Sequence, residues 1–321
     1  MQEIRLTQYE AGQRLDRYLR KLLPAVPLGA IFRYLRRGDI RVDGNKVQGD
    51  MRLEAGMTVT LQVPEADVQK APPPITRVPD EFDPFDLLPG DTGPKPEAKV
   101  LVPQIVLRDD HVLVVDKPAG LAVHGGTGQE RSLVSWLAMQ RWGVRTATFK
   151  PAPAHRLDRG TSGLVLIGLV PDALRALTEA FRQDAVQKVY FAVVHGVPQR
   201  PNGTISARLM EVPDADPRQA KVIVDDRGTP ARTDYETVKH NDRMSLLRVV
   251  PHSGRQHQIR VHLQHLGHPI VGDHRYGSLA QVGQGFLLHA ESLAFKHPVT
   301  GKRVVCTAPL PREFRRLLDP E

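Results

Sequence analysis

The chain has 321 residues, of which 40% are apolar and 25% are charged. This composition is typical of a folded globular protein and excludes wholesale disorder, and the length suggests two domains or one large domain with an appendage. No run of about 18 apolar residues occurs, so the sequence predicts no membrane-spanning helix. The single cysteine, Cys306, cannot form an internal disulfide or a thiolate metal cluster. With no signal-peptide pattern at the N-terminus, we expect a cytoplasmic protein that does not associate with membranes.

Basic residues outnumber acidic ones by 44 to 36, and the excess is unevenly distributed. Residues 1–64 carry a net charge of +4, residues 65–99 carry −4, and residues 100–321 carry +8. A basic balance of this kind indicates a polyanionic partner. The acidic stretch 65–99 contains eight prolines, which exclude continuous helix and central strand. We therefore predict two domains, 1–64 and 100–321, joined by a Pro-rich acidic linker.

The first domain is predicted to be a compact α+β unit. Apolar spacing predicts helices over 15–23 and 28–37, the second ended by Gly38. The Asp43-Gly44 pair predicts a hairpin turn, and a further strand follows within residues 57–63.

Basic side chains gather around the second predicted helix and the hairpin: Arg33, Arg36, Arg37, Arg41 and Lys46. A charged run is often only a solvated face, but this clustering on a small unit favours a phosphate-binding face. The segment IFRYLRRGDIRVDGNKV resembles the S4 RNA-binding domain in its order of helix, glycine, short strand and Asp-Gly turn. The resemblance implies that residues 1–64 form an S4-like RNA-binding domain.

The second domain is predicted to be a mixed α+β sheet, because strands outnumber helices and do not alternate strictly with them. The predicted strands are 105–107, 112–115, 163–169, 188–195, 233–238 and 245–250, and the predicted helices are 132–141, 171–183 and 256–266.

Asp158 is the first candidate for chemistry, in the segment HRLDRGTSG. It lies between Arg156 and Arg159, and neighbouring cations favour the charged carboxylate, which can then act as a nucleophile or a base. A turn aspartate held by an arginine is an equally good interpretation of this pattern.

Two further segments carry candidate side chains. Tyr190 lies on a predicted strand, where it can pack in the core, stack on a base or transfer a proton. In SGRQHQIRVH, Ser253-Gly254 is expected to open a helix on which His257 and Arg260 share one face. Arg260 could then reach a buried carboxylate, although a basic surface helix would show the same pattern.

A cluster of histidines suggests a metal site as an alternative. His262, His265 and His268 are spaced three apart, with others nearby. No HExxH motif is present, and Gly267 and Pro269 are expected to end the helix before His268. We therefore expect no metal site.

Three segments, HRLDRGTSG, QKVYFAVVHG and SGRQHQIRVHLQHLGHPIVGDHRYG, resemble in sequence and order the RluA/RluC/RluD family of pseudouridine synthases. VVDKPAGLAVHGG and LLHAESLAFKHP support the resemblance. It implies a mixed, mostly antiparallel sheet in two halves with a cleft between them. It also implies isomerisation of uridines in RNA, a reaction that requires no metal or organic cofactor.

The resemblance also implies residue roles. Asp158 takes the place of the catalytic aspartate, Tyr190 that of the tyrosine against the target base, and Arg260 that of the arginine paired with the aspartate. Arg156 matches the position from which some relatives insert a side chain into the RNA stack. Further predicted RNA contacts are His155, Arg255 and His257.

The S4-like domain and the AVHGGTG loop resemble family members of the ribosomal large-subunit type. This favours 23S rRNA, in a pre-ribosomal large-subunit substrate, as the partner. A monomer is the default expectation, to which the resemblance adds nothing. The same chemistry on tRNA or on other 23S uridines, and a non-catalytic RNA-binding protein of ribosome assembly, are the alternatives.

Overall fold

The computed structural model describes residues 1–64, 101–125, 131–140, 142–214 and 220–316. Contacts divide these residues into two compact units. The smaller unit contains residues 1–64 together with 142–151 and 169–172, and the larger contains the rest. The predicted linker, 65–99, lies outside the described residues, so the division of the chain into domains stays a prediction.

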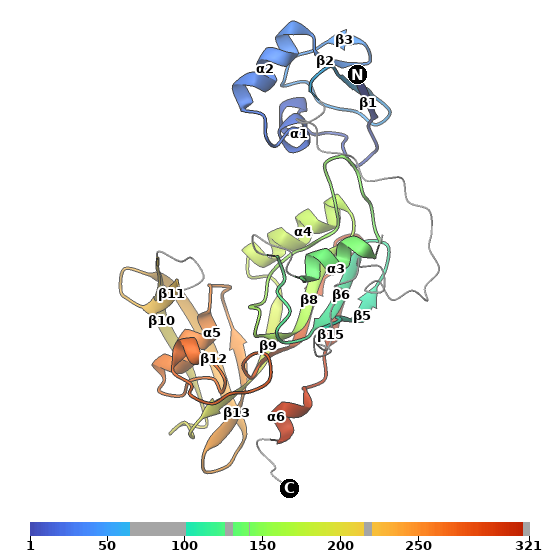
Figure 1. Ribbon diagram of the computed structural model, residues 1–321. Helices are drawn as coiled ribbons and strands as arrows, with labels where there is room; N and C mark the ends of the chain where they lie inside the picture. Colours follow the sequence, from blue (N-terminus) through green and yellow to red (C-terminus); the bar gives the residue numbers. More distant parts are fainter. Residues whose placement is uncertain (65–100, 126–130, 141, 215–219, 317–321) are drawn as a thin grey trace, which may run out of the picture. The chain divides into compact units, whose positions relative to one another are not determined.

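The smaller unit is built from two helices and a four-stranded antiparallel sheet (Figure 1). The helices are α1 (Leu15–Leu22) and α2 (Leu28–Arg37), and the strands, in sheet order, are β1 (Gln2–Arg5), β4 (Thr58–Leu61), β2 (Ile40–Val42) and β3 (Asn45–Lys46). Both predicted helices and the hairpin are confirmed. Asp43 and Gly44 have φ values of 49° and 77°, as a two-residue turn of type I′ requires. Strand β1 was not predicted, since its four residues alternate apolar and polar too briefly to give a signal.

The larger unit contains one sheet of eleven strands. They are β5 (Gln104–Arg108), β6 (Val112–Lys117), β7 (Ala152–Pro153), β8 (Ser162–Gly168), β9 (Gln187–His195), β10 (Asn202–Val212), β11 (Lys221–Val224), β12 (Thr229–His240), β13 (Met244–Pro251), β14 (Leu288–Lys296) and β15 (Arg303–Thr307). The six predicted strands are confirmed. Strands β7, β10, β11, β14 and β15 were not predicted; most residues of β10, for example, are polar or exposed.

The sheet has two halves that meet at a short parallel pairing. Strands β11-β10-β12-β13-β9-β14 form one half and β8-β6-β5 the other. Only two residue pairs join β14 to β8, His289 with Ser162 and Ala290 with Gly163, whereas the other strand pairings are antiparallel. Gly163 has a φ of 110°, and a Cβ there would lie 2.3 Å from the carbonyl oxygen of Ala290. A glycine is thus required where the halves join, and the expected mixed, mostly antiparallel sheet is confirmed.

Helices are few: α3 (Leu133–Met139), α4 (Pro171–Arg182), α5 (Gln258–His265), the short α6 (Arg312–Arg316) and a 3-10 turn, η2 (His274–Tyr276). Figure 1 shows α3 and α4 on one side of β6 and β8, while α5 lies against the half of the sheet that contains β10 and β12. The three predicted helices are confirmed, with α5 shorter than expected. Among the described residues, no helix has the length and hydrophobicity needed to cross a membrane.

The prediction that Ser253-Gly254 opens the last predicted helix is wrong. The helix α5 begins at Gln258, directly after His257, whose φ is 52°. The Gln258 side chain accepts hydrogen bonds from the Ser253 hydroxyl (2.7 Å) and the Arg255 amide (3.1 Å). These bonds hold residues 253–257 as a loop, because they direct the Ser253 hydroxyl and the Arg255 amide toward the Gln258 side chain.

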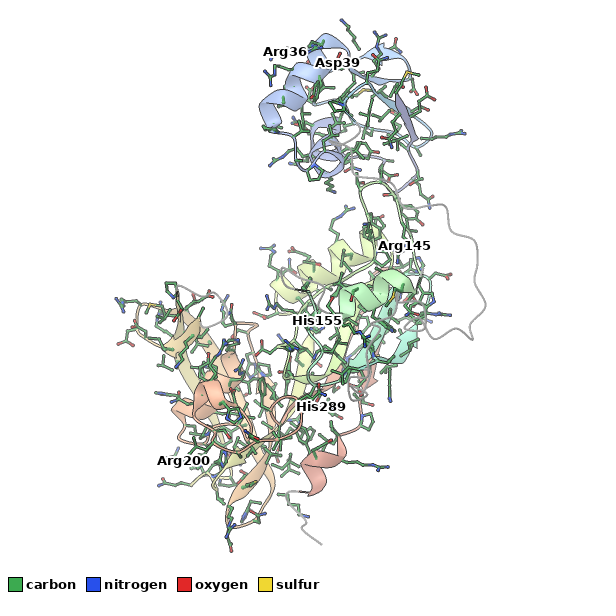
Figure 2. The ribbon with its side chains drawn as sticks, in the orientation of Figure 1. Arg36, Asp39, Arg145, His155, Arg200 and His289 are labelled. Carbon is green, nitrogen blue, oxygen red and sulfur yellow. The ribbon has the colours of Figure 1, made fainter. Side chains whose placement is uncertain are left out.

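His289 lies at the junction of the two halves and is fully buried (Figure 2). Its Nδ1 is 2.9 Å from the Ser162 hydroxyl, and its Nε2 is 3.4 Å from the carbonyl oxygen of Ala308. Burial lowers the pKa of His289 to about 4. The imidazole is therefore neutral at pH 7.

We expect His289 to make the stability of the protein depend on pH. Because the pKa is lower in the folded state than in the unfolded chain, the unfolded state binds more protons between pH 4 and 6.5, and stability is lost as the pH falls through this window. From the shift to about 4, the loss is on the order of 3 kcal/mol. Urea unfolding from pH 4.5 to 7.5 measures the free energy of unfolding as a function of pH. This dependence should be flatter in His289→Gln, whereas the same change at the exposed His265 should leave it unaltered. Parallel curves for His289→Gln and wild type would contradict this assignment.

Candidate active site

A cavity of about 320 Å³ opens in the larger unit where the loop between β7 and β8 faces the start of α5. Its wall is formed by the β7–β8 loop, α4, β9, the loop after β13, α5 and β14. The side chains that matter for chemistry in this wall are Arg156, Asp158, Lys188, Tyr190, His257 and Arg260. Segments about 100 residues apart in sequence thus converge on one cavity.

Asp158 and Arg260 form an ion pair in the wall of this cavity. Nη1 of Arg260 donates to Oδ2 of Asp158 at 2.7 Å. The Arg260 side chain is 7% exposed, whereas that of Asp158 is 25% exposed. The buried Arg260 therefore fixes one oxygen of the carboxylate, while the carboxylate remains accessible to a substrate in the cavity.

Arg260 is itself held on all sides. Its Nε and Nη2 donate to the two carboxylate oxygens of Asp273, at 2.7 and 2.9 Å. The guanidinium carbon lies 4.8 Å from the ring centre of Tyr276 and 4.5 Å from that of Phe286. A planar guanidinium bound bidentately and stacked against aromatic rings has little freedom to move, so Arg260 can set the direction of the Asp158 carboxylate.

His257 approaches the other oxygen of Asp158. Its Nε2 is 3.7 Å from Oδ1 of Asp158, and its Nδ1 is 2.8 Å from the hydroxyl of Tyr276. Burial lowers the pKa of His257 to about 4, despite the nearby Asp158 charge. The expected convergence of His257 and Arg260 therefore occurs, but not through helix spacing, because His257 precedes the first residue of α5.

Tyr190 lies on β9, between Val249 of β13 and Ala290 of β14. It is half-buried and lines the same cavity as Asp158. Burial and the Asp158 charge raise the pKa of the Tyr190 hydroxyl. The side chain is thus a neutral phenol near pH 7, able to stack on a base or donate a hydrogen bond but poorly suited to act as a phenolate base.

The other predicted RNA contacts of this unit differ in their surroundings. Arg156 and Arg255 line the cavity with exposed side chains. His155 also lines it, but its Nε2 accepts a hydrogen bond from the Leu166 amide at 3.0 Å and its ring stacks on Phe181 at 4.2 Å. Burial, with the charge of a nearby lysine, lowers the pKa of His155 to about 3. These contacts give His155 a role in holding the loop to β8.

Sequence reasoning gave no role to Lys117. This side chain is fully buried, and its Nζ donates to the carbonyl oxygens of Pro118 (3.1 Å), Leu121 (2.8 Å) and Arg159 (3.4 Å). Burial lowers the pKa of Lys117 to about 7. Since Arg159 follows Asp158, Lys117 ties the β7–β8 loop to the turn after β6.

Sequence reasoning also gave no role to Asp273 and Tyr276. Asp273 is 2% exposed, although its pattern, GDHRYG, is that of a turn. The sequence signal for this position is the glycine directly before the aspartate. In the structure Gly272 has a φ of 89°, a backbone conformation that favours glycine.

The three histidines spaced three apart do not converge. His262 is buried, with Nδ1 2.8 Å from the Thr233 hydroxyl. His265 is exposed, and His268, beyond the end of α5, has Nδ1 2.8 Å from the carbonyl oxygen of His195. Within the described part of the chain, no three His, Cys, Asp or Glu side chains gather as metal ligands would.

In the smaller unit, the five predicted RNA-binding side chains are all exposed. Arg41 donates to the carbonyl oxygens of Gly38 and Gly44, at 3.1 and 3.2 Å. A Cβ on Gly38 would lie 2.5 Å from Cε of Lys46. The hairpin cations thus lie over the C-terminal end of α2, next to the arginines of that helix; Figure 2 shows Arg36 at the surface.

Comparison with known proteins gives the class of enzyme. Residues 111–265 match the family described as RNA pseudouridylate synthase. With the relatives below, this shows that the chain belongs to the pseudouridine synthase family, of the RluA type. It is an isomerase that acts on RNA.

Particular relatives extend over nearly the whole chain. A ribosomal large subunit pseudouridine synthase C of Escherichia coli (strain K12) is 34% identical over 328 residues, which cover 98% of this chain and 95% of the relative. The protein of the same name from Salmonella typhimurium is 35% identical and covers 97% of this chain and 93% of the relative. The solved structure of human RNA pseudouridylate synthase domain containing 1 superposes with a TM-score of 0.55 at 28% identity, covering 68% of this chain and 86% of the human one.

Proposed function

We propose that this protein isomerises uridines in 23S rRNA, within a precursor of the large ribosomal subunit, with Asp158 as the catalytic carboxylate. The observation that carries the proposal is the Arg260–Asp158 contact of 2.7 Å in a cavity that Tyr190 also lines. The relatives named as ribosomal large subunit synthases support the choice of substrate. A monomer in the cytoplasm is part of the proposal.

The chemistry requires one carboxylate at the sugar. Pseudouridine formation breaks the C1′–N1 bond, turns the base and joins C1′ to C5; N1 then carries a proton, and C5 loses one. Asp158 can attack C1′ or stabilise an oxocarbenium-like sugar, as carboxylates do in glycoside hydrolysis, or it can remove a ribose proton. Arg260 fixes the orientation of the carboxylate, which each of these routes requires.

In this proposal Tyr190 and Arg156 stabilise the flipped-out conformation of the target base. Flipping a base out of its stack costs a few kcal/mol. Stacking of the flipped base on an aromatic ring such as Tyr190 offsets roughly 1–3 kcal/mol of this cost. The exposed Arg156 guanidinium at the cavity edge can fill the gap left in the RNA stack. Because the Tyr190 phenol is neutral, a water held by its hydroxyl is the better acceptor for the C5 proton.

We propose that residues 1–64 form an S4-like RNA-binding domain whose cations contact phosphates. Besides the exposed cations, this unit has a groove of about 680 Å³ lined by Phe32, Arg36 and Lys46, with Phe32 37% exposed. An exposed aromatic ring between cations suits a single-stranded nucleotide. Phosphate contacts here would add affinity and register but little sequence information.

If the arginines of α2 contact phosphates, they should contribute to the salt dependence of RNA binding. The variant Arg33→Gln/Arg36→Gln should lower the slope of log K against log salt by about 1.4–1.8, since each lost phosphate contact removes about 0.7–0.9. The matched control is Arg182→Gln/Arg227→Gln, where the arginines pair with Glu179 and Asp225. Filter binding of a 23S rRNA fragment from 50 to 300 mM KCl measures both. Equal slopes for the two variants would count against the proposed RNA-binding face.

The substrate is tested by mapping pseudouridine in 23S rRNA and tRNA from cells that lack the protein, through carbodiimide-dependent stops of reverse transcription. We expect a few stops in 23S rRNA to disappear and to return with the wild-type chain but not with Asp158→Asn. Stops that disappear only from tRNA would replace the ribosomal substrate with a transfer RNA. Unchanged stops in both RNAs would refute the proposed substrate.

A further inference from the structure

The two oxygens of the Asp158 carboxylate have different surroundings. Oδ2 receives a hydrogen bond of 2.7 Å from Arg260, whereas Oδ1 has Nε2 of His257 at 3.7 Å. A carboxylate held through one oxygen can still rotate about that contact. A second donor at Oδ1 would fix the plane of the carboxylate, and donor distances of this kind shorten when substrate closes an active site.

The surroundings of His257 favour a proton on Nε2. The hydroxyl of Tyr276 accepts a hydrogen bond from the buried Val222 amide at 3.1 Å and is 2.8 Å from Nδ1 of His257. The hydroxyl has a single hydrogen, and with Val222 on its acceptor side that hydrogen can be donated to Nδ1. Nδ1 then acts as the acceptor, and in the neutral ring Nε2 carries the hydrogen and faces Asp158.

The backbone at His257 indicates that this placement is specific. His257 has a φ of 52°, in the left-handed region that residues other than glycine rarely adopt. Gln258 fixes the loop on one side, through Nε2 donating to the carbonyl oxygen of Arg232 and to the Thr233 hydroxyl, both at 3.0 Å. Backbone strain of this kind is concentrated at functional sites.

Burial favours the neutral form of His257, although the charged groups around it act in both directions. It faces the carboxylates Asp158 and Asp273, the cations Arg260 and Arg275, and the Tyr276 hydroxyl. Burial lowers its pKa to about 4; the Asp158 and Asp273 charges oppose this shift, and the two cations act in the same direction as burial. A neutral ring can donate to Asp158 without neutralising its charge, whereas an imidazolium would pair with the carboxylate and compete with the sugar.

We propose that His257 is a positioning residue for Asp158: its neutral imidazole, oriented by Tyr276, presents Nε2–H to Oδ1 and fixes the plane of the catalytic carboxylate. This role differs from the RNA contact that the sequence predicts for His257. It rests on the proposed function of Asp158, and it makes Tyr276 a second positioning residue that acts through His257.

The kinetic test compares two changes at His257 in the full-length protein. His257→Gln keeps an amide donor near the position of Nε2, whereas His257→Phe keeps the ring and loses both nitrogens. At saturating RNA, we expect the single-turnover rate of His257→Phe to fall by about 10- to 100-fold, as small misplacements of reacting groups do. His257→Gln should recover most of that loss, and Kd for the RNA should stay within about twofold of wild type for both.

The matched control is His265→Gln, the same substitution at an exposed position of α5. It should leave rate and affinity unchanged. A weaker Kd with an unchanged rate at saturation would make His257 an RNA contact and overturn the proposal. Equal losses of rate in His257→Gln and His257→Phe, with a lowered Tm, would reduce it to a structural residue and overturn the proposal as well.

A spectroscopic test is independent of turnover. In the protein labelled with 15N-histidine, the His257 signal, assigned by its loss in His257→Gln, should show the Nε2–H tautomer at pH 7. Tyr276→Phe should shift it toward a mixture of tautomers. An Nδ1–H tautomer or an imidazolium in the wild type would overturn the proposal, even if the activity of Asp158 is established. Conversely, a wild-type protein without activity on RNA would refute the proposed function and leave this tautomer result unchanged.

Discussion

Asp158→Asn is expected to lower the single-turnover rate of pseudouridine formation by at least about a thousandfold, because every route open to this carboxylate needs its charge or its basicity. The asparagine has the same size, and its amide oxygen can still accept from Nη1 of Arg260, which lies 2.7 Å from the carboxylate. Binding of the RNA should therefore stay within about threefold of wild type. Release of tritium from RNA labelled at C5 of uridine measures the rate, and filter binding measures the affinity.

Asp110→Asn is the matched control for this variant. Asp110 is exposed and lies in the turn before β6, outside the cavity. The same change there should leave the rate unaltered. Product formation by Asp158→Asn at the wild-type rate would remove Asp158 from the mechanism, and a large loss of RNA affinity would assign it to binding.

Much of the fold could be predicted because its elements carry strong local signals. Strands β6 and β8 are nearly continuous apolar runs that are buried along almost their whole length. Helix α2 has apolar residues at helical spacing and ends at a glycine with a φ of 84°. Strands β10 and β11 lie at one end of the sheet, and their mixture of exposed and buried residues gives no comparable local pattern. Their position is determined by pairing over long sequence distances.

The candidate site could be predicted less completely, because its geometry depends on contacts between distant segments. The pattern around Arg260 indicated a carboxylate partner but could not name Asp158, which is 102 residues away. Asp273 is only 13 residues from Arg260, yet in sequence it is one of many aspartates in glycine-flanked turns. His257 was placed beside Arg260 by helix spacing, and the structure places it there through a loop held by Gln258. The family resemblance supplied the pairing that local patterns could not.

Arg260→Met is expected to reduce both stability and activity, since it leaves two carboxylates without their shared cation. Asp273 is 2% exposed and would become an unpaired buried charge. Breaking a buried ion pair in this way costs about 3–5 kcal/mol. The single-turnover rate should fall by at least about a hundredfold, because Asp158 loses the donor that directs it. Urea unfolding and the tritium-release assay measure the two effects separately.

The double variant Arg260→Met/Asp273→Asn separates the two roles of the arginine. Replacing Asp273 by asparagine removes the buried charge that Arg260→Met leaves behind, so about 1–3 kcal/mol of the lost stability should return. The rate should not return, because no side chain replaces the guanidinium that donates to Asp158 at 2.7 Å. If the rate recovers together with the stability, then Arg260 acts only in folding, and the direction of the Asp158 carboxylate must depend on other donors, with His257 the next in distance.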